Sequence, residues 1–134
     1  MLEPLSLVRS VGFAVLFAGV EYRYINRREA SGKDGLDQLG ERPAFWVITP
    51  YHAYFLLPVF ILVALAPLVT AWAANTFLIA LLEDVAYFTW RGKWVQSGEW
   101  TTLMFGSFRV SRVTIPTWWP LALAISVSLY LMPL

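Results

Sequence analysis

The chain has 134 residues, of which 58% are hydrophobic and 14% are charged, and its formal net charge is +1. Soluble domains are about 45–50% apolar and about 25% charged, so this composition excludes an ordinary soluble domain and indicates an integral membrane protein. A net charge near zero creates no strong positive potential that would attract a nucleic acid. The lack of cysteine excludes disulfides, iron–sulfur clusters and cysteine-ligated zinc. We expect a single transmembrane domain over residues 1–134.

The first apolar run predicts a transmembrane helix over residues 5–25. Residues 1–4 contain no basic side chain, so we expect this run to be retained rather than cleaved as a signal peptide. Arg9, near the start of the run, is expected to extend its charged end to the lipid headgroups.

Small side chains on this first helix recur every four residues, at Ser10, Ala14 and Ala18. Small residues at this spacing let two helices approach closely in lipid. Glu21 continues the same face, so we expect its carboxylate to point toward other helices rather than toward lipid.

The stretch from Phe45 to Leu82 has no acidic or basic residue apart from His52. It is too long for one crossing, because a transmembrane helix needs only about 20 residues. The sequence therefore predicts a helical hairpin, with a second span over residues 50–67 and a third over residues 72–90.

Prolines mark the second span. Thr49 followed by Pro50 is typical of a helix start, with a capping residue before a proline in the first turn. Pro58 removes one backbone donor inside the span and is expected to kink it. We place the tight turn of the hairpin at residues 67–71.

The segment 91–114 is predicted to be an interfacial loop or short helix rich in tryptophan. Its basic residues alternate with indole side chains, a pattern that suits the headgroup layer. A fourth span follows over residues 115–134. Structural or interfacial roles are expected for Arg91, Trp94, Trp100 and Trp118.

Four spans would form an all-α, four-helix membrane bundle with both termini on one side. The charged loops, residues 23–46 and 91–114, would lie on the other side and hold most of the basic residues. The positive-inside rule then predicts cytoplasmic loops and external termini. The bias favours a prokaryotic cytoplasmic membrane.

Four ionisable side chains would lie at similar depth in the cytoplasmic third of the bilayer: Glu21, His52, Glu83 and Asp84. Charged groups inside a membrane are costly and usually face a protein interior or a wet cavity. Glu83, Asp84 and Glu21 are therefore candidate catalytic or proton-relay groups. All four are candidate metal ligands, and this oxygen-rich set would favour iron, manganese or magnesium.

A purely structural role is the alternative for these side chains. Asp84 could pair with Arg91 two turns along the same helix, and buried pairs of this kind orient helices without chemistry. His52, in the first turn of a helix, would then be a neutral interfacial histidine.

Small size and small-residue helix faces favour a non-catalytic accessory or structural subunit of a larger membrane complex. Its partners would be membrane lipids and other membrane subunits, or further copies of the chain. The rival hypothesis is a membrane-embedded metal-dependent enzyme, or a proton- or ion-handling module, built on the carboxylate and histidine layer. A lipid-binding module is a third possibility, because basic loops with interleaved tryptophans suit anionic headgroups.

Overall fold

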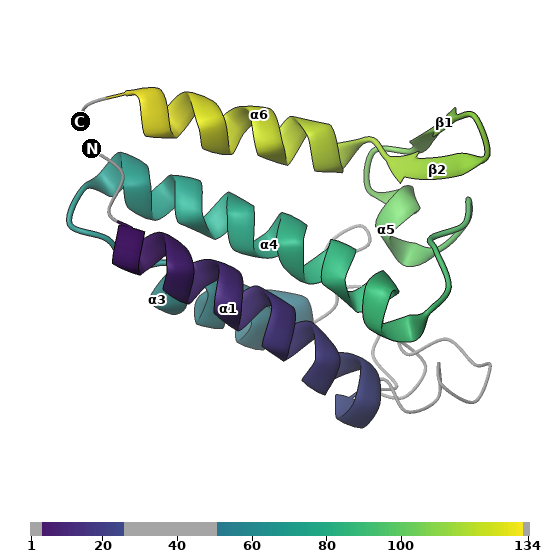
Figure 1. Cartoon of the computed structure of the whole chain (residues 1–134), viewed down its shortest axis with the longest axis horizontal. Coiled ribbons are helices and arrows are strands. Elements are labelled where there is room, and N and C mark those ends of the chain that lie inside the picture. The colour runs from purple at the N-terminus through teal and green to yellow at the C-terminus, as the bar shows by residue number, and fades with distance from the viewer. Residues whose placement is uncertain (1–3, 26–50, 133–134) are drawn as a thin grey trace.

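The computed structural model of the chain describes residues 4–25 and 51–132. Helices dominate both ranges, as the sequence predicts (Figure 1). In chain order the elements are α1 (Pro4–Val20), the π-helical turns η1 (Glu21–Ile25) and η3 (Tyr51–Leu56), α3 (Leu57–Val63), α4 (Val69–Arg91), α5 (Trp100–Leu103), β1 (Ser107–Val110), β2 (Val113–Pro116) and α6 (Trp118–Leu131). The predicted cap at Thr49 and Pro50, and most of the first polar loop, lie outside the described residues.

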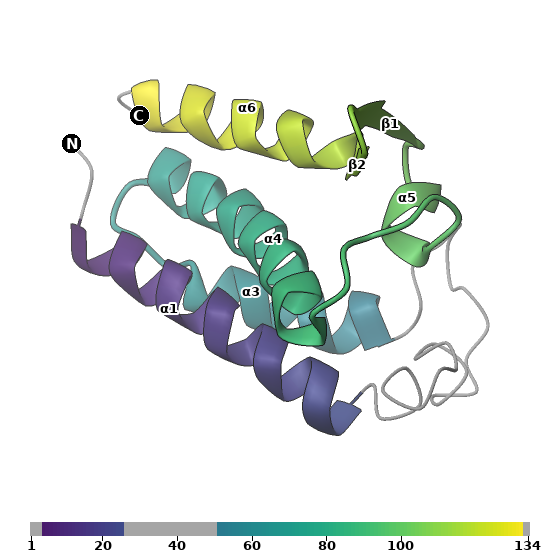
Figure 2. The ribbon, with the colours of Figure 1, turned by 45° about the vertical axis from the view of Figure 1, so that its right-hand side comes forward.

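Helix α4 is the centre of the bundle. It packs against α1 and α3 on one side and against α6 on the other, and Figure 2 shows α4 between α1 and α6. The helix ends where Gly92 adopts a φ of 71°, and the Gly92 N–H donates to the Thr89 carbonyl over 3.1 Å. Glycine suits this position because a left-handed cap is strained for residues with a Cβ.

Two helices are long and apolar enough to cross a membrane, Pro4–Tyr24 with 21 residues and Val69–Arg91 with 23. They confirm the helices predicted over residues 5–25 and 72–90. By length and composition, they are consistent with an association of the protein with a membrane.

The helices predicted over residues 50–67 and 115–134 exist but are shorter, at Tyr51–Val63 and Trp118–Leu131. A helix of 14 residues is about 21 Å long, whereas the hydrocarbon core of a bilayer is about 30 Å thick. A bundle of four full spans is therefore not confirmed. The second helix changes from π-helical to α-helical geometry beside Pro58, where the sequence predicts a kink.

The segment 91–114 contains part of a β-hairpin that the sequence did not predict. After α5, strands β1 and β2 form a two-stranded antiparallel sheet, paired from Ser107↔Pro116 to Val110↔Val113. Ser111, in the two-residue turn, has a φ of 58°, as the turns favoured in hairpins require. A strand of four residues is too short for its alternation of apolar and polar side chains to be recognised within the tryptophan-rich, basic segment around it.

The small-residue face predicted on the first helix is confirmed. The buried residues of α1 recur every four positions and are Ser6, Ser10, Ala14 and Ala18. Glu21 continues this buried face, as predicted.

Helix α6 divides its small residues between two faces. Ala122 and Ser126 are buried, and the Ser126 hydroxyl donates to the Ala74 carbonyl of α4 over 3.0 Å. Ala124 and Ser128 are exposed. Only one of these two pairs therefore packs inside the bundle.

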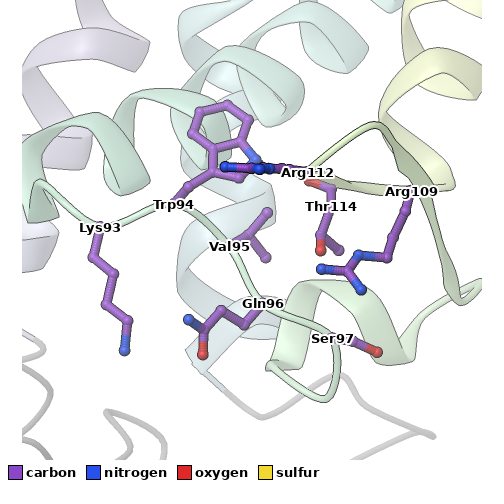
Figure 3. Close-up of a pocket in the computed structure, with 8 residues that line it drawn as sticks. All are labelled: Lys93, Trp94, Val95, Gln96, Ser97, Arg109, Arg112 and Thr114. Atoms are coloured by element: carbon purple, nitrogen blue, oxygen red, sulfur yellow. Dashed lines mark hydrogen bonds between the residues drawn. The ribbon is translucent and has the colours of Figure 1, made fainter.

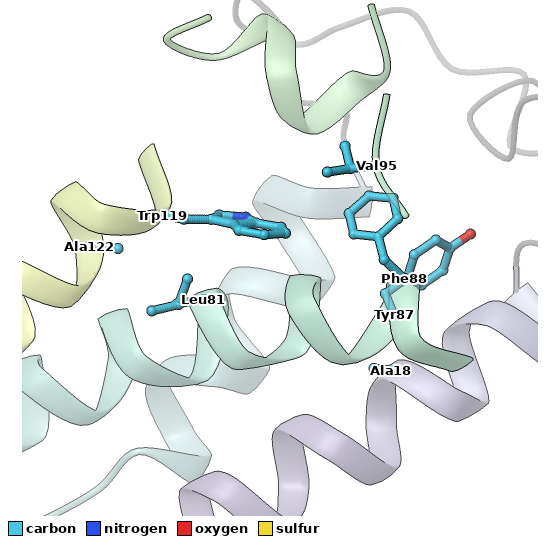
Figure 4. Close-up of a cluster of buried hydrophobic side chains, with 7 residues drawn as sticks. All are labelled: Ala18, Leu81, Tyr87, Phe88, Val95, Trp119 and Ala122. Atoms are coloured by element: carbon cyan, nitrogen blue, oxygen red, sulfur yellow. The ribbon is translucent and has the colours of Figure 1, made fainter. Parts of the chain in front are cut away.

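The two ends of the bundle are built from different elements. At one end α6 returns to the start of α4, where Thr70 Oγ1 donates to the Met132 carbonyl over 3.2 Å. At the other end lie α5, the hairpin and the start of α6 (Figure 1). A buried apolar cluster connects α1, α4, the 92–99 segment and α6 toward this second end (Figure 4). Its members are Ala18, Leu81, Tyr87, Phe88, Val95, Trp119 and Ala122.

Candidate polar site around the central helix

Glu83 lies in a polar cluster between α4, η1 and η3. Its side chain and that of Glu21 are almost completely buried, with 5% and 7% of their surface exposed. Glu21, Glu83 and Tyr51 lie close enough to act on one another electrostatically. The cluster therefore places two buried carboxyl groups and a phenol side by side between α4 and the two π-helical turns.

A carboxyl oxygen of this cluster is buried without a partner. Within residues 4–25 and 51–132, Glu83 Oε1 forms no hydrogen bond. Buried polar atoms without a partner are rare and commonly mark strain, chemistry or a water site. This oxygen is therefore a chemical irregularity in the interior of the described bundle.

Asp84 turns away from Glu83, toward α5 and α6. Its Oδ2 accepts a hydrogen bond from Thr101 Oγ1 over 2.5 Å and another from Trp119 Nε1 over 2.7 Å. Thr101 Oγ1 in turn accepts from Trp118 Nε1 over 2.8 Å. The network joins three elements, so Asp84 holds α5 and the start of α6 onto α4.

The predicted pairing of Asp84 with Arg91 is wrong. Arg91 instead binds Glu99 through its two terminal guanidinium nitrogens, with N–O distances of 2.6 and 3.1 Å. Arg91 Nε also donates to the Lys93 carbonyl over 3.0 Å, and the guanidinium lies 4.5 Å from the centre of the Phe88 ring. The 92–99 segment folds back over the end of α4 and brings Glu99 to Arg91, a contact that helical spacing alone does not anticipate.

Glu99 is held in its ionised form by these contacts. Partial burial alone would raise its pKa, but hydrogen bonds from Arg91 and from the Gln96 backbone N–H more than offset that effect. Together with the charges of Arg91 and Lys93, they hold the pKa of Glu99 below its ordinary value of 4.5. The pair fixes the loop that follows α4.

His52 does not join the carboxylates as a ligand. Its ring stacks on Trp100 of α5, with centroids 4.4 Å apart and planes inclined by 13°, and meets Tyr51 edge to face at 5.4 Å. Across the described ranges, no three His, Asp or Glu side chains gather in a way that could hold a metal ion. The residues expected to bind iron, manganese or magnesium therefore do not form a ligand set there.

The tryptophans predicted to be interfacial have specific partners. Trp94 is 40% exposed, yet its Nε1 donates to the Thr114 carbonyl over 2.8 Å. Trp100 stacks on His52, and Trp118 donates to Thr101. Trp100 and Trp118 therefore attach the 92–117 segment to helical neighbours, and Trp94 joins two parts of that segment.

Asn75 is a buried polar residue that the sequence argument missed. Its Nδ2 donates to the Ala64 carbonyl over 3.1 Å and lies 3.4 Å from Ser6 Oγ, while its Oδ1 accepts from the Tyr130 hydroxyl. One amide thus connects α1, α4 and α6 with the connection after α3. The signal was present in the sequence, because Asn75 is an amide inside a long apolar run.

Arg9 also differs from its predicted role. Rather than reaching only toward headgroups, its guanidinium donates to the carbonyls of Val63, over 2.9 Å, and Leu65. The last carbonyls of a helix have no partner within the helix, so a cation placed there satisfies them and favours the helix dipole. Arg9 therefore caps α3.

Comparison of the chain with protein-family models, with curated proteins and with solved structures gives no match.

Proposed function

We propose that the chain is a small integral membrane protein that acts as a non-catalytic accessory subunit of a larger membrane complex. The observation that carries the proposal is the outward face of α6. This face is apolar, with Leu121, Leu123, Val127 and Leu131 all about half exposed or more. Exposed apolar area of this extent is unusual for a soluble monomer and marks a surface that lipid or protein covers.

Two features indicate that another protein, rather than lipid alone, covers part of the outward face of α6. Ala124 and Ser128 lie on the exposed side of α6 at a spacing of four residues, which allows close approach of another membrane helix. The helix itself is shorter than the hydrocarbon core, so neighbouring helices would shield its ends better than lipid does. Other membrane subunits are the favoured occupants, and further copies of the chain are the alternative.

The ionisable groups are consistent with a structural role. Asp84 is engaged with Thr101 and Trp119, and Arg91 is engaged with Glu99. Each of these contacts joins segments of the same chain. The proposal expects Asp84→Asn and Glu83→Gln to disturb assembly more than any turnover of the complex.

The membrane topology remains part of the proposal. We infer four membrane segments, with α3 and α6 as short ones, charged loops 23–46 and 91–114 in the cytoplasm, and both termini outside. Basic residues of both loops support this orientation through the positive-inside rule. A prokaryotic cytoplasmic membrane fits the same bias.

Blue-native electrophoresis of the protein extracted from its own membrane tests the docking face. Ala124→Trp places a large side chain on the outward face of α6, while Leu62→Trp places one on the exposed face of α3, where Leu62 is 66% exposed. We expect Ala124→Trp to lose the high-mass complex and Leu62→Trp to keep it. Migration of the unmodified protein as a single chain would overturn the proposal.

A second candidate function is proton or ion handling, favoured by the Glu21–Glu83–Tyr51 cluster. The two helices that bring Glu21 and Tyr51 to α4 both have π-helical geometry where they meet it, and π-helical turns occur frequently at functional sites. The unpartnered Glu83 Oε1 provides an acceptor for a proton or a water.

Proton flux into vesicles that contain the purified protein separates the two functions. A transport role predicts measurable flux that Glu83→Gln abolishes and that Glu99→Gln, outside the cluster, leaves intact. Absence of flux in the unmodified protein, or equal flux in the Glu83→Gln variant, would remove this candidate.

A further inference from the structure

A basic pocket lies between the 93–97 segment and the hairpin. Its volume is about 410 Å³, within the usual range of small-molecule sites, about 300–1,000 Å³. Figure 3 shows Lys93 and Gln96 on one side of this region and Arg109 on the other, with the Arg112 side chain drawn across the indole of Trp94. The residues that line it are Lys93, Trp94, Val95, Gln96, Ser97, Arg109, Arg112 and Thr114.

All the charged side chains that line the pocket are positive. Lys93, Arg109 and Arg112 contribute three positive charges, and no acidic residue is among the lining side chains. Glu99, the nearest acidic residue along the chain, is bound to Arg91 and to the Gln96 N–H, so it is already occupied. In the described part of the chain, the three cations form no ion pair.

The pocket is built on a fixed frame. Thr114 is buried, and its carbonyl accepts from Trp94 Nε1, which ties the 93–97 segment to β2. Arg109 faces Thr114 directly across the hairpin, so the two side chains share one face of the sheet. Val95 is 2% exposed and anchors the middle of the segment in the apolar cluster. The cationic groups are therefore presented by ordered backbone rather than by a free tail.

The surroundings of the pocket are apolar. Phe105, Phe108, Val110 and Val113 are all exposed on or beside the hairpin. Cationic side chains beside exposed aromatic and aliphatic groups are typical of the headgroup layer of a membrane. A guanidinium group binds phosphate oxygens in a fork geometry, and two of the three cations are arginines.

We propose that this pocket binds a phosphate group, through Lys93, Arg109 and Arg112, with Gln96 and Ser97 as neutral donors. The phosphate could be that of an anionic lipid headgroup or of a soluble phosphate ester. The exposed apolar side chains beside the pocket favour the lipid. The proposal is independent of the accessory role, because it concerns a ligand site at one end of the bundle rather than a docking face on α6.

Binding to the purified, detergent-solubilised full chain tests this site. The probes are short-chain phosphatidylglycerol, short-chain phosphatidylcholine as the zwitterionic control, and inorganic phosphate. Arg109→Gln removes one pocket charge, and Arg23→Gln removes one exposed charge on η1, away from the pocket. Because hydrogen bonds to charged groups are stronger than neutral ones, we expect Arg109→Gln to weaken phosphatidylglycerol binding about tenfold or more. The Arg23→Gln control should bind as the unmodified chain does.

Each outcome decides the question. Saturable binding of phosphatidylglycerol that Arg109→Gln weakens, with little binding of inorganic phosphate, supports a lipid headgroup. Comparable Arg109-dependent binding of inorganic phosphate supports a soluble phosphate ester. No saturable binding of any anionic probe, or equal losses in Arg109→Gln and Arg23→Gln, overturns the proposal. Trp fluorescence and thermal unfolding of both variants check that these exposed substitutions leave the fold intact.

Discussion

The indole of Trp90 lies directly against Gly19, so a Cβ built at Gly19 would be 2.9 Å from the indole Cε2. Trp90 Nε1 also donates to the Val15 carbonyl over 2.8 Å, one turn earlier in α1. The absence of a side chain at Gly19 thus allows a tryptophan of α4 to reach the backbone of α1. This contact lies at the same end of the bundle as the Glu21–Glu83 cluster.

Gly19→Ala should destabilise the packing of α1 on α4. The new methyl group would force the indole away and break its hydrogen bond, and overpacking of this kind costs about 1–3 kcal/mol. Gly12→Ala is the matched control, because a Cβ at Gly12 meets nothing within 4 Å. In thermal unfolding in detergent, we expect a lower midpoint for Gly19→Ala and an unchanged or higher one for Gly12→Ala. Equal midpoints for the two variants would contradict the contact.

Asp84→Ala should loosen α5 and α6 from α4. The substitution leaves the Thr101 hydroxyl and the Trp119 N–H without their acceptor, and a buried donor left unsatisfied costs about 1–3 kcal/mol. Asp84→Asn keeps one acceptor oxygen and should cost less. The measurement is the unfolding free energy of both variants, with Trp fluorescence as the probe of Trp119. If Ala and Asn substitutions were equally harmless, the network would not hold these elements.

The Arg91–Glu99 pair should make stability depend on pH in acid. The pKa of Glu99 is lower in the folded chain than its ordinary value of 4.5. The contribution of the pair is therefore complete above that value and is lost as the pH falls through the lower, folded pKa. Partly exposed pairs are worth up to about 1 kcal/mol, so the effect should be small.

Unfolding measured across this pH window, for the unmodified protein and for Glu99→Gln, checks the sign. We expect the difference in stability between the two to be greatest near neutral pH and to shrink below pH 4.5. A difference that stays constant with pH would show that Glu99 acts through packing rather than charge.

Cysteine labelling should report the orientation of the bundle without background, because the chain contains no cysteine. Leu68→Cys places a thiol on the connection before α4, and Ser97→Cys places one on the exposed loop after it. With a reagent that does not cross membranes, we expect Leu68→Cys to react in intact cells. Ser97→Cys should react only after the cells are opened, and the reverse pattern would invert the proposed topology.

The sequence predicted the helices best where one physical pattern acts alone. Apolar length specified α1 and α4, and the spacing of Ser10, Ala14 and Ala18 specified the face that α1 buries. Adjacent positions on a helix are about 100° apart, which is why Glu83 and Asp84 reach different neighbours. These predictions depend only on local geometry, so no knowledge of the tertiary structure was needed.

The parts that the sequence did not predict depend on how the chain returns on itself. Arg91 meets Glu99 because Gly92 ends α4 and turns the chain back, and Arg9 meets Val63 because α3 ends beside α1. The partners of Asn75 likewise come from three separate segments. Charge and spacing along one helix contain no information about such contacts.

Native mass spectrometry of the chain, gently extracted from its own membrane, tests the accessory role most directly. The account predicts other membrane subunits bound at a fixed stoichiometry, and it predicts that Ala124→Trp releases them while Leu62→Trp does not. A single chain, or a homo-oligomer that carries a metal or small-molecule mass, would contradict the account and shift the functional assignment to the Glu21–Glu83 cluster.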